Sequence, residues 1–236
     1  MSRSLRLTLL SVYETLAISA PTVVDAALGR VTKAACDARI ERWSAQVVRR
    51  LGAHVEVRGR ENARGGPFVI MSNHQSHYDV PLLFHVLGSN LRMVAKQELF
   101  RIPVFGAAMR GAGFISVDRA DRARAIESLA SARPLLESGT HLWIAPEGTR
   151  SRTGALGPFK KGGFLLAEQL GVPILPITIC GTRDILPSSG LLSSPGQRVV
   201  VTIHPPVPPP AGGPDPRAAR ERTLEAVRAA IASALP

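Results

Sequence analysis

The stretch MSNHQSHYD, residues 71 to 79, contains two histidines and an aspartate within six residues. His74 can serve as a general base, because imidazole changes its protonation state near neutral pH. Asp79 follows at a separation that lets its carboxylate reach back to the imidazole across a turn entering a helix. Such a contact fixes the tautomer and leaves the other ring nitrogen free to take a proton. The chain has no GxSxG motif and no cysteine close by in sequence, so the pair predicts a base that activates a substrate hydroxyl.

Other interpretations of the same stretch remain open. Histidines at this spacing, together with Asp79, occur in zinc sites, but the sequence offers no second pair of ligands, and no metal is expected. Asn73 and Ser76 can cap the helix that follows the strand, a role compatible with catalysis nearby. His77 is interpreted as a structural or rim residue.

More polar residues stand where other apolar runs end. Lys96 closes the run RMVAK, Arg119 follows FISVD, and the cluster PEGTR, which ends at Arg150, follows HLWIA. If these runs are parallel strands, the residues emerge at one edge of the sheet, and this carboxyl edge is where open α/β sheets bind ligands. Arginine side chains offer forked donors suited to phosphate. The pattern predicts one site that combines a base with phosphate-binding cations.

The segments between these residues alternate in type. Seven short β-like runs are followed or separated by helix-like segments at 79–87, 103–110, 120–137 and 161–170. This alternation predicts an α/β fold with a mainly parallel central sheet of about seven strands covered by helices. The expected strands are 54–57, 68–71, 92–95, 114–117, 141–145, 174–179 and 199–203.

Residues 1–52 have helical periodicity. Apolar residues recur at spacings of three and four, and basic residues flank them, which predicts amphipathic helices that either lie on an anionic bilayer or pack on the domain. The two stripes are Leu5, Leu9, Val12, Leu16 and Ile40, Trp43, Val47, Leu51. No membrane-spanning helix is predicted, because the uncharged run from Thr15 to Val24 is about half the roughly 20 residues required and Pro21 interrupts it.

The chain is accordingly divided into three parts. Residues 1–52 are assigned to membrane-docking helices, residues 53–204 to the α/β domain, and residues 205–236 to a proline-rich linker and a final helix. Lys+Arg 29 against Asp+Glu 18 gives a net charge of +11, which favours anionic partners. No nucleic-acid-binding motif appears, so nucleic acid is not an expected partner. Cys36 and Cys180 predict neither a disulfide nor a zinc site and fit a reducing compartment.

Four blocks of the sequence carry a family resemblance. NHQSHYD resembles the HxxxxD block of the glycerolipid acyltransferases, and GFISVDR, PEGTR and VPILPITI are similar to their second, third and fourth blocks. The runs AKQELFRIPVFG and FKKGGF also resemble the 1-acylglycerol-3-phosphate (lysophosphatidate) acyltransferases. The similarity extends from about Val57 to Ile203, with the blocks in the family's order.

The resemblance implies transfer of a fatty acyl group from a coenzyme A or acyl carrier protein thioester to the free hydroxyl of 1-acylglycerol 3-phosphate. The product is phosphatidic acid for phospholipid biosynthesis. His74 would be the general base and Asp79 its orienting partner, with no metal or cofactor. Substrate-binding residues implied by the resemblance are Lys96, Arg119, Glu147, Gly148, Thr149 and Arg150. It also implies a peripheral or monotopic enzyme on the cytoplasmic face of the cell membrane. The alternative is acylation of another lyso-lipid, such as a lysophospholipid or lyso-ornithine lipid.

Overall fold

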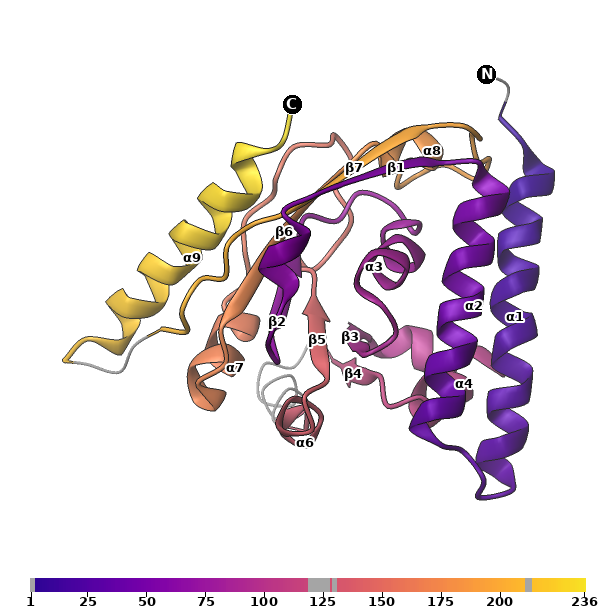
Figure 1. Ribbon diagram of the computed structural model, residues 1–236, viewed down its shortest axis with the longest axis horizontal. Helices are drawn as coiled ribbons and strands as arrows, with labels where there is room; N and C mark the ends of the chain where they lie inside the picture. The colour runs from indigo at the N-terminus through magenta and orange to yellow at the C-terminus, as the bar shows by residue number, and fades with distance from the viewer. Residues whose placement is uncertain (1–2, 119–127, 129–130, 211–213) are drawn as a thin grey trace.

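The computed structural model describes residues 3–118, 128, 131–210 and 214–236. Seven strands form one sheet that lies between two layers of helices (Figure 1). The strands are β1 (His54–Arg58), β2 (Val69–Ser72), β3 (Leu91–Lys96), β4 (Ile115–Val117), β5 (His141–Ile144), β6 (Ile174–Cys180) and β7 (Arg198–Ile203). Each predicted β-like run is therefore a strand.

The strand order across the sheet is β1-β7-β6-β2-β5-β3-β4. Strands β6, β2, β5, β3 and β4 run parallel to one another, with Val69 of β2 opposite Leu142 of β5. Strand β7 runs antiparallel to β6 and parallel to β1. The predicted α/β fold with a mainly parallel sheet is confirmed, and the carboxyl ends of β2, β3, β4 and β5 share one edge.

Helices cover both faces of this sheet. They are α1 (Leu5–Ala27), α2 (Lys33–Leu51), α3 (Asp79–Leu87), α4 (Phe105–Gly111), α6 (Arg133–Glu137), α7 (Gly162–Leu170), α8 (Thr182–Ile185) and α9 (Pro216–Ser233), with two short 3-10 helices, η1 (Arg60–Ala63) and η2 (Gln97–Arg101). The predicted helix 79–87 coincides with α3. Most of the predicted helix 120–137 lies outside the described residues, and α6 is its described C-terminal part.

Two apolar cores lie on opposite faces of the sheet. Ile70 belongs to the core shared with α2 and α3, whereas Val69 and Met71 belong to the core shared with α7 and α9. Figure 1 shows these helix pairs on opposite sides of the strands. A strand buried on both faces is apolar at consecutive positions, which explains the run VIM in β2. Helices α2 and α9, which lie outside the predicted domain 53–204, share these cores with the sheet. The predicted domain boundaries at residues 52 and 204 stay a prediction.

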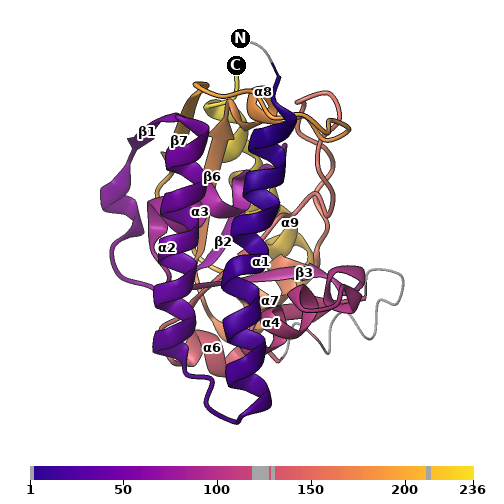
Figure 2. The same cartoon turned by 90° about the vertical axis from the view of Figure 1, so that its right-hand side faces the viewer.

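The two N-terminal helices lie side by side (Figure 2), and α1 is the outer of the two (Figure 1). The apolar stripe of α2 is buried or packed in the core, but the stripe of α1 is exposed, with Leu9 58% accessible. Glu14 points inward and pairs with Arg50 at 2.6 Å. The expectation that Pro21 interrupts this segment is wrong, because the helix continues through it to Ala27. By length and composition, α1 is long and apolar enough to cross a membrane.

Candidate active site

His74 and Asp79 lie at the carboxyl end of β2, where the chain turns into α3. Nδ1 of His74 is 2.7 Å from Oδ2 of Asp79. The same oxygen accepts the backbone N–H groups of Gln75 at 2.7 Å and Ser76 at 2.9 Å. The Asp79 side chain is fully buried, whereas that of His74 is 17% exposed. The carboxylate thus holds Nδ1 in place, and Nε2 is the ring nitrogen left to exchange a proton.

Glu147, on the turn after β5, holds the backbone around His74. Its Oε1 accepts the N–H of His74 at 3.0 Å, and its Oε2 accepts the N–H of Gly157 at 2.8 Å. The carbonyl of His74 accepts the N–H of Ser151 at 2.7 Å. Because β2 and β5 are parallel neighbours, their carboxyl ends bring the first and third sequence blocks together. Glu147 is buried, and both of its oxygens are satisfied by backbone donors.

The two candidate capping residues have other partners. Asn73 donates from Nδ2 to the carbonyl of Ile179 and accepts the N–H of Ile179 at its Oδ1, both at 2.8 Å. It therefore joins the end of β2 to β6, and its predicted capping role is wrong. Ser76 accepts the N–H of Tyr78 at 3.2 Å and donates to the carbonyl of Leu186 at 2.8 Å, so it supports the turn into α3.

Two of the three predicted cationic residues, Lys96 and Arg150, lie at the same edge. Lys96 is exposed at the end of β3, and Arg150 is partly buried two residues beyond Gly148. Burial lowers the pKa of Arg150, and the Asp79 charge opposes this shift. Loss of solvation lowers the pKa of His77 most, and the charges of Arg150, His74 and Lys96 lower it further. These charges therefore act on one another across a single site.

The third block makes a tight turn. Gly148 has φ 72°, a left-handed conformation that favours glycine, and the Lys160 side chain lies close beside it. Thr149 is exposed beside it. Arg119 lies outside the described residues, so its phosphate-binding role stays a prediction.

Sequence reasoning missed two contributors to this edge. Lys160, in the run FKKGGF, packs against Gly148. Arg228 of α9 donates to the carbonyl groups of Gly157 at 2.5 Å and Leu156 at 3.2 Å, and its guanidinium lies over the Phe159 ring. The resemblance of the run FKKGGF to the family is a signal that could have identified Lys160. No local pattern distinguishes Arg228 from the other arginines of the final helix.

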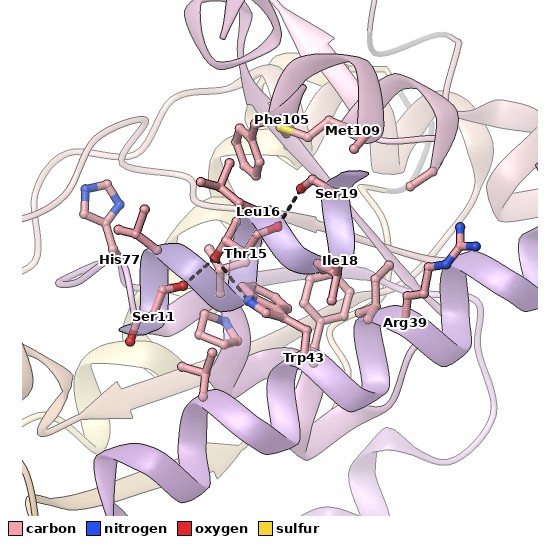
Figure 3. A pocket seen from close by; sticks show the side chains of 18 of the residues that line it. Ser11, Thr15, Leu16, Ile18, Ser19, Arg39, Trp43, His77, Phe105 and Met109 are labelled. Carbon is pink, nitrogen blue, oxygen red and sulfur yellow. Dashed lines mark hydrogen bonds between the residues drawn. The ribbon is translucent and has the colours of Figure 1, made fainter. Parts of the chain in front are cut away.

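An apolar cavity of about 460 Å³ lies between α1 and helices α2, α3 and α4. Figure 3 shows His77 at one end of it and Arg39 toward the other. The hydroxyl groups of Ser11, Thr15 and Ser19 on its wall donate to carbonyl oxygens within α1, and Nε1 of Trp43 donates to Thr15. The wall thus offers few polar groups in need of a partner, a property suited to a long apolar ligand.

No group of three metal-ligating side chains occurs within the described part of the chain. Both Cys36 and Cys180 are free thiols, and burial raises the pKa of each. In the HxxxxD stretch, the carboxylate oxygen nearest His74 is taken up by the imidazole and two backbone donors. This arrangement fixes the orientation of the His74 ring.

The acyltransferase family model matches residues 54–180, more than half of the chain. The chain belongs to the acyltransferase family. This acyltransferase is 40% identical over 156 residues to the chloroplastic 1-acyl-sn-glycerol-3-phosphate acyltransferase BAT2 of Brassica napus, an alignment covering 64% of this chain and 44% of that protein. It is 37% identical over 166 residues to the human 1-acyl-sn-glycerol-3-phosphate acyltransferase alpha, covering 70% and 58% of the two chains.

Among solved structures, the acyltransferase resembles the 1-acyl-sn-glycerophosphate acyltransferase PlsC of Thermotoga maritima. The two are 28% identical with a TM-score of 0.77, and the match covers 98% of this chain and 95% of that one. The chain spans about half the length of the curated relatives it matches. The matched region contains all four sequence blocks and Lys160, whereas Arg228 of α9 lies outside it. The family match and the geometry around His74 therefore concern the same part of the fold.

Proposed function

We propose that this acyltransferase moves a fatty acyl group from an acyl thioester to the free hydroxyl of 1-acylglycerol 3-phosphate, giving phosphatidic acid for phospholipid biosynthesis. The observation that carries this proposal is the contact of 2.7 Å between Nδ1 of His74 and the buried Asp79 carboxylate. It leaves a base ready at the sheet edge that also carries Lys96 and Arg150. The names of the relatives supply the acceptor.

His74 is the general base of the proposed reaction. The acceptor hydroxyl attacks the thioester carbonyl carbon, and its proton passes to Nε2 of His74 as the new C–O bond forms. The tetrahedral intermediate then collapses, the C–S bond breaks, and the departing thiolate takes the proton from the imidazolium. Asp79 stabilises the imidazolium while it exists, as a buried carboxylate does in other base-assisted acyl transfers. No acyl-enzyme forms, and neither a metal nor a cofactor takes part.

The acceptor phosphate is bound by cations at the sheet edge. Arg150 is partly buried and keeps its charge, because guanidinium is not deprotonated in proteins. Lys96 and Arg119 are its proposed companions, while Glu147, Gly148 and Thr149 shape the turn on which Arg150 stands. A lysophospholipid or lyso-ornithine lipid is the alternative acceptor, and it would place less demand on these cations.

The cavity beside His77 is proposed to take an acyl chain, with coenzyme A or acyl carrier protein as the thioester carrier. Its wall includes α1, whose outer surface is apolar. We propose that α1 holds the enzyme on the phospholipid surface at the cytoplasmic face of the membrane, as a peripheral or monotopic protein. Substrates whose chains already lie in the bilayer would then reach the cavity without crossing water.

The test is transfer by the purified protein between each of two donors, acyl-CoA and acyl carrier protein thioester, and a panel of lyso-lipids. We expect phosphatidic acid from lysophosphatidate to form fastest, with the rate unchanged by a chelator. Faster turnover of a lysophospholipid or lyso-ornithine lipid would favour the alternative acceptor. No transfer to any of these acceptors would contradict the proposal.

A further inference from the structure

The exposed large apolar side chains are confined to a few segments of the part of the chain that the structure describes. They come from α1 and the turn after it, from the turn that follows η2, and from the loop before β7. The residues are Leu5, Leu9, Val12, Tyr13, Leu16, Val24 and Leu28, then Ile102 and Val104, then Leu191 and Leu192. Apolar exposure gathered in this way indicates an interaction surface.

The loop before β7 is fixed to the first turns of α1. Ser193 is fully buried, and its carbonyl accepts the N–H of Ser4 at 2.8 Å. Its N–H donates to Oγ1 of Thr8 at 3.0 Å, and its hydroxyl contacts that of Thr8 at 2.8 Å. The phenol of Tyr78 also contacts the Ser193 hydroxyl at 2.8 Å. Leu191, which is 80% exposed, therefore has a defined place beside α1 although it stands on a loop.

The turn after η2 lies beside α1 through the packing of the next helix. Ile102 and Val104 lead into α4, which packs on α1. Val104 has φ 63°, a conformation that a β-branched residue rarely adopts, and it is 42% exposed there. A costly backbone conformation that leaves an apolar side chain in water is better explained by a function than by stability.

The cavity opens among these residues. Ile102 on the turn and Val12 and Leu16 on α1 line the cavity, and each is also exposed on the outer surface. An apolar surface and the mouth of an apolar cavity are therefore continuous. A protein partner seated here would cover the mouth, whereas a bilayer would supply chains to it.

We propose that the Leu191–Leu192 loop and the Ile102–Val104 turn enter the same lipid bilayer as the exposed face of α1, so that the enzyme docks at three points around the cavity mouth. This inference rests on the membrane docking of α1 in the proposed function. Exposed arginines accompany the apolar residues, with Arg6 beside Leu5 and Arg101 beside Ile102, which suits a surface of anionic phospholipid.

Tryptophan probes test the contact directly. Leu191→Trp and Ile102→Trp should each be quenched by brominated phospholipid in anionic vesicles, beyond the background from Trp43 and Trp143 in the wild-type protein. Leu9→Trp reports on α1. Ala226→Trp is the matched control, because Ala226 is exposed on α9, on the opposite side of the molecule from α1 (Figure 1), and it should show no added quenching.

The outcomes separate this inference from the proposal on which it rests. Quenching of Leu9→Trp without quenching of Leu191→Trp and Ile102→Trp would overturn the three-point contact and leave docking through α1 intact. No quenching of any of the three probes would overturn both. Quenching of Leu191→Trp without quenching of Ile102→Trp would show that the turn after η2 does not enter the bilayer, and would overturn that part of the proposal.

A second measurement uses the loss of apolar area. The double variant Leu191→Ser, Leu192→Ser should bind anionic vesicles about 10- to 100-fold more weakly than wild type in sedimentation, about 1.4 to 2.8 kcal/mol at 1.4 kcal/mol per tenfold. Leu191→Phe, Leu192→Phe should restore binding. Unchanged binding of the serine variant would overturn the role of the loop. Light scattering without lipid tests whether a second copy of the chain covers this surface instead. A wild-type dimer that the serine variant abolishes would make this face a contact between two copies of the chain and overturn the proposal.

Discussion

The carboxylate of Glu147 divides its two oxygens between the backbones of His74 and Gly157, at 3.0 Å and 2.8 Å. The residue therefore connects the loop that carries His74 to the loop that carries Lys160. A carboxylate is suited to this position because both of its oxygens accept, whereas an amide has one acceptor and one donor.

Glu147→Gln should consequently impair both folding and turnover. The amide NH₂ would face a backbone N–H, which leaves a buried donor unsatisfied at a cost of about 1–3 kcal/mol in the free energy of unfolding. We expect kcat to fall at least about tenfold, because a small displacement of His74 misplaces the base. Denaturant unfolding and steady-state rates measure the two effects. Glu221→Gln, which breaks only the exposed pair with Lys161, should change neither by much, and equal behaviour of the two variants would contradict this role of Glu147.

The two histidines of the HxxxxD stretch provide a matched pair. His74→Ala should lower the rate of acyl transfer by about 100- to 10,000-fold with the fold retained, the range typical of a lost general base. His77→Ala should have a far smaller effect, because His77 lines the cavity, whereas His74 is the histidine whose ring contacts the Asp79 carboxylate. Rates within a few-fold of wild type for His74→Ala would rule out the mechanism.

Arg150 should determine preference for a phosphorylated acceptor. Arg150→Ala should raise the KM for lysophosphatidate by about 10- to 150-fold, since a charged hydrogen-bond partner is worth about 1.5–3 kcal/mol. Arg150→Lys should recover only part of the lost affinity for lysophosphatidate, because an ammonium group lacks the planar fork of a guanidinium. Arg152→Ala, exposed two positions on, is the control. If Arg150→Ala still prefers lysophosphatidate over a matched monoacylglycerol, Arg150 does not bind the phosphate.

Arg119→Ala is expected from the sequence to behave like Arg150→Ala. The decisive measurement is again the ratio of rates with lysophosphatidate and monoacylglycerol. A retained preference in this variant alone would assign the phosphate to Arg150 and Lys96.

His141 should make stability fall in acid. Its Nδ1 accepts the N–H of Phe68 at 3.2 Å, its ring stacks on the Phe68 ring, and burial lowers its pKa below the usual 6.5. The unfolded chain then binds the proton more readily than the folded one. The stabilisation is complete above pH 6.5 and is lost as pH falls toward the folded-state pKa, by at most about 1.4 kcal/mol per pH unit. Unfolding of His141→Asn should depend less steeply on pH between 6.5 and 5, and an unchanged slope would contradict the assignment.

The alternation of apolar runs predicted the sheet because most of the strands are short, mainly apolar segments. It also predicted that His74, Lys96 and Arg150 lie at one edge of the sheet, since parallel strands bring their carboxyl ends together whatever lies between them. The antiparallel direction of β7 left no local sign, because VVVTI is equally apolar in either orientation. Direction is set by the connection, here a long loop after α8.

Contacts between distant residues account for most of what the sequence did not predict. Asn73 pairs with Ile179, 106 positions away, and no helix or strand period contains that spacing. Glu14 is a buried charged residue in the apolar helix α1, and its partner Arg50 lies on the neighbouring helix, 36 positions away in the sequence. Arg228 acts on the loop at Gly157 through a similar long-range contact.

The contact of Arg228 with Gly157 can form only late in the synthesis of the chain. Synthesis proceeds from the N-terminus, so α1 leaves the ribosome before any strand, and α9 follows all seven. If α1 binds the bilayer as proposed, it is available to a membrane throughout translation. The loop beside Glu147 lacks its contact with Arg228 until α9 has been added. A nascent chain can be delivered to the bilayer before its active site is complete.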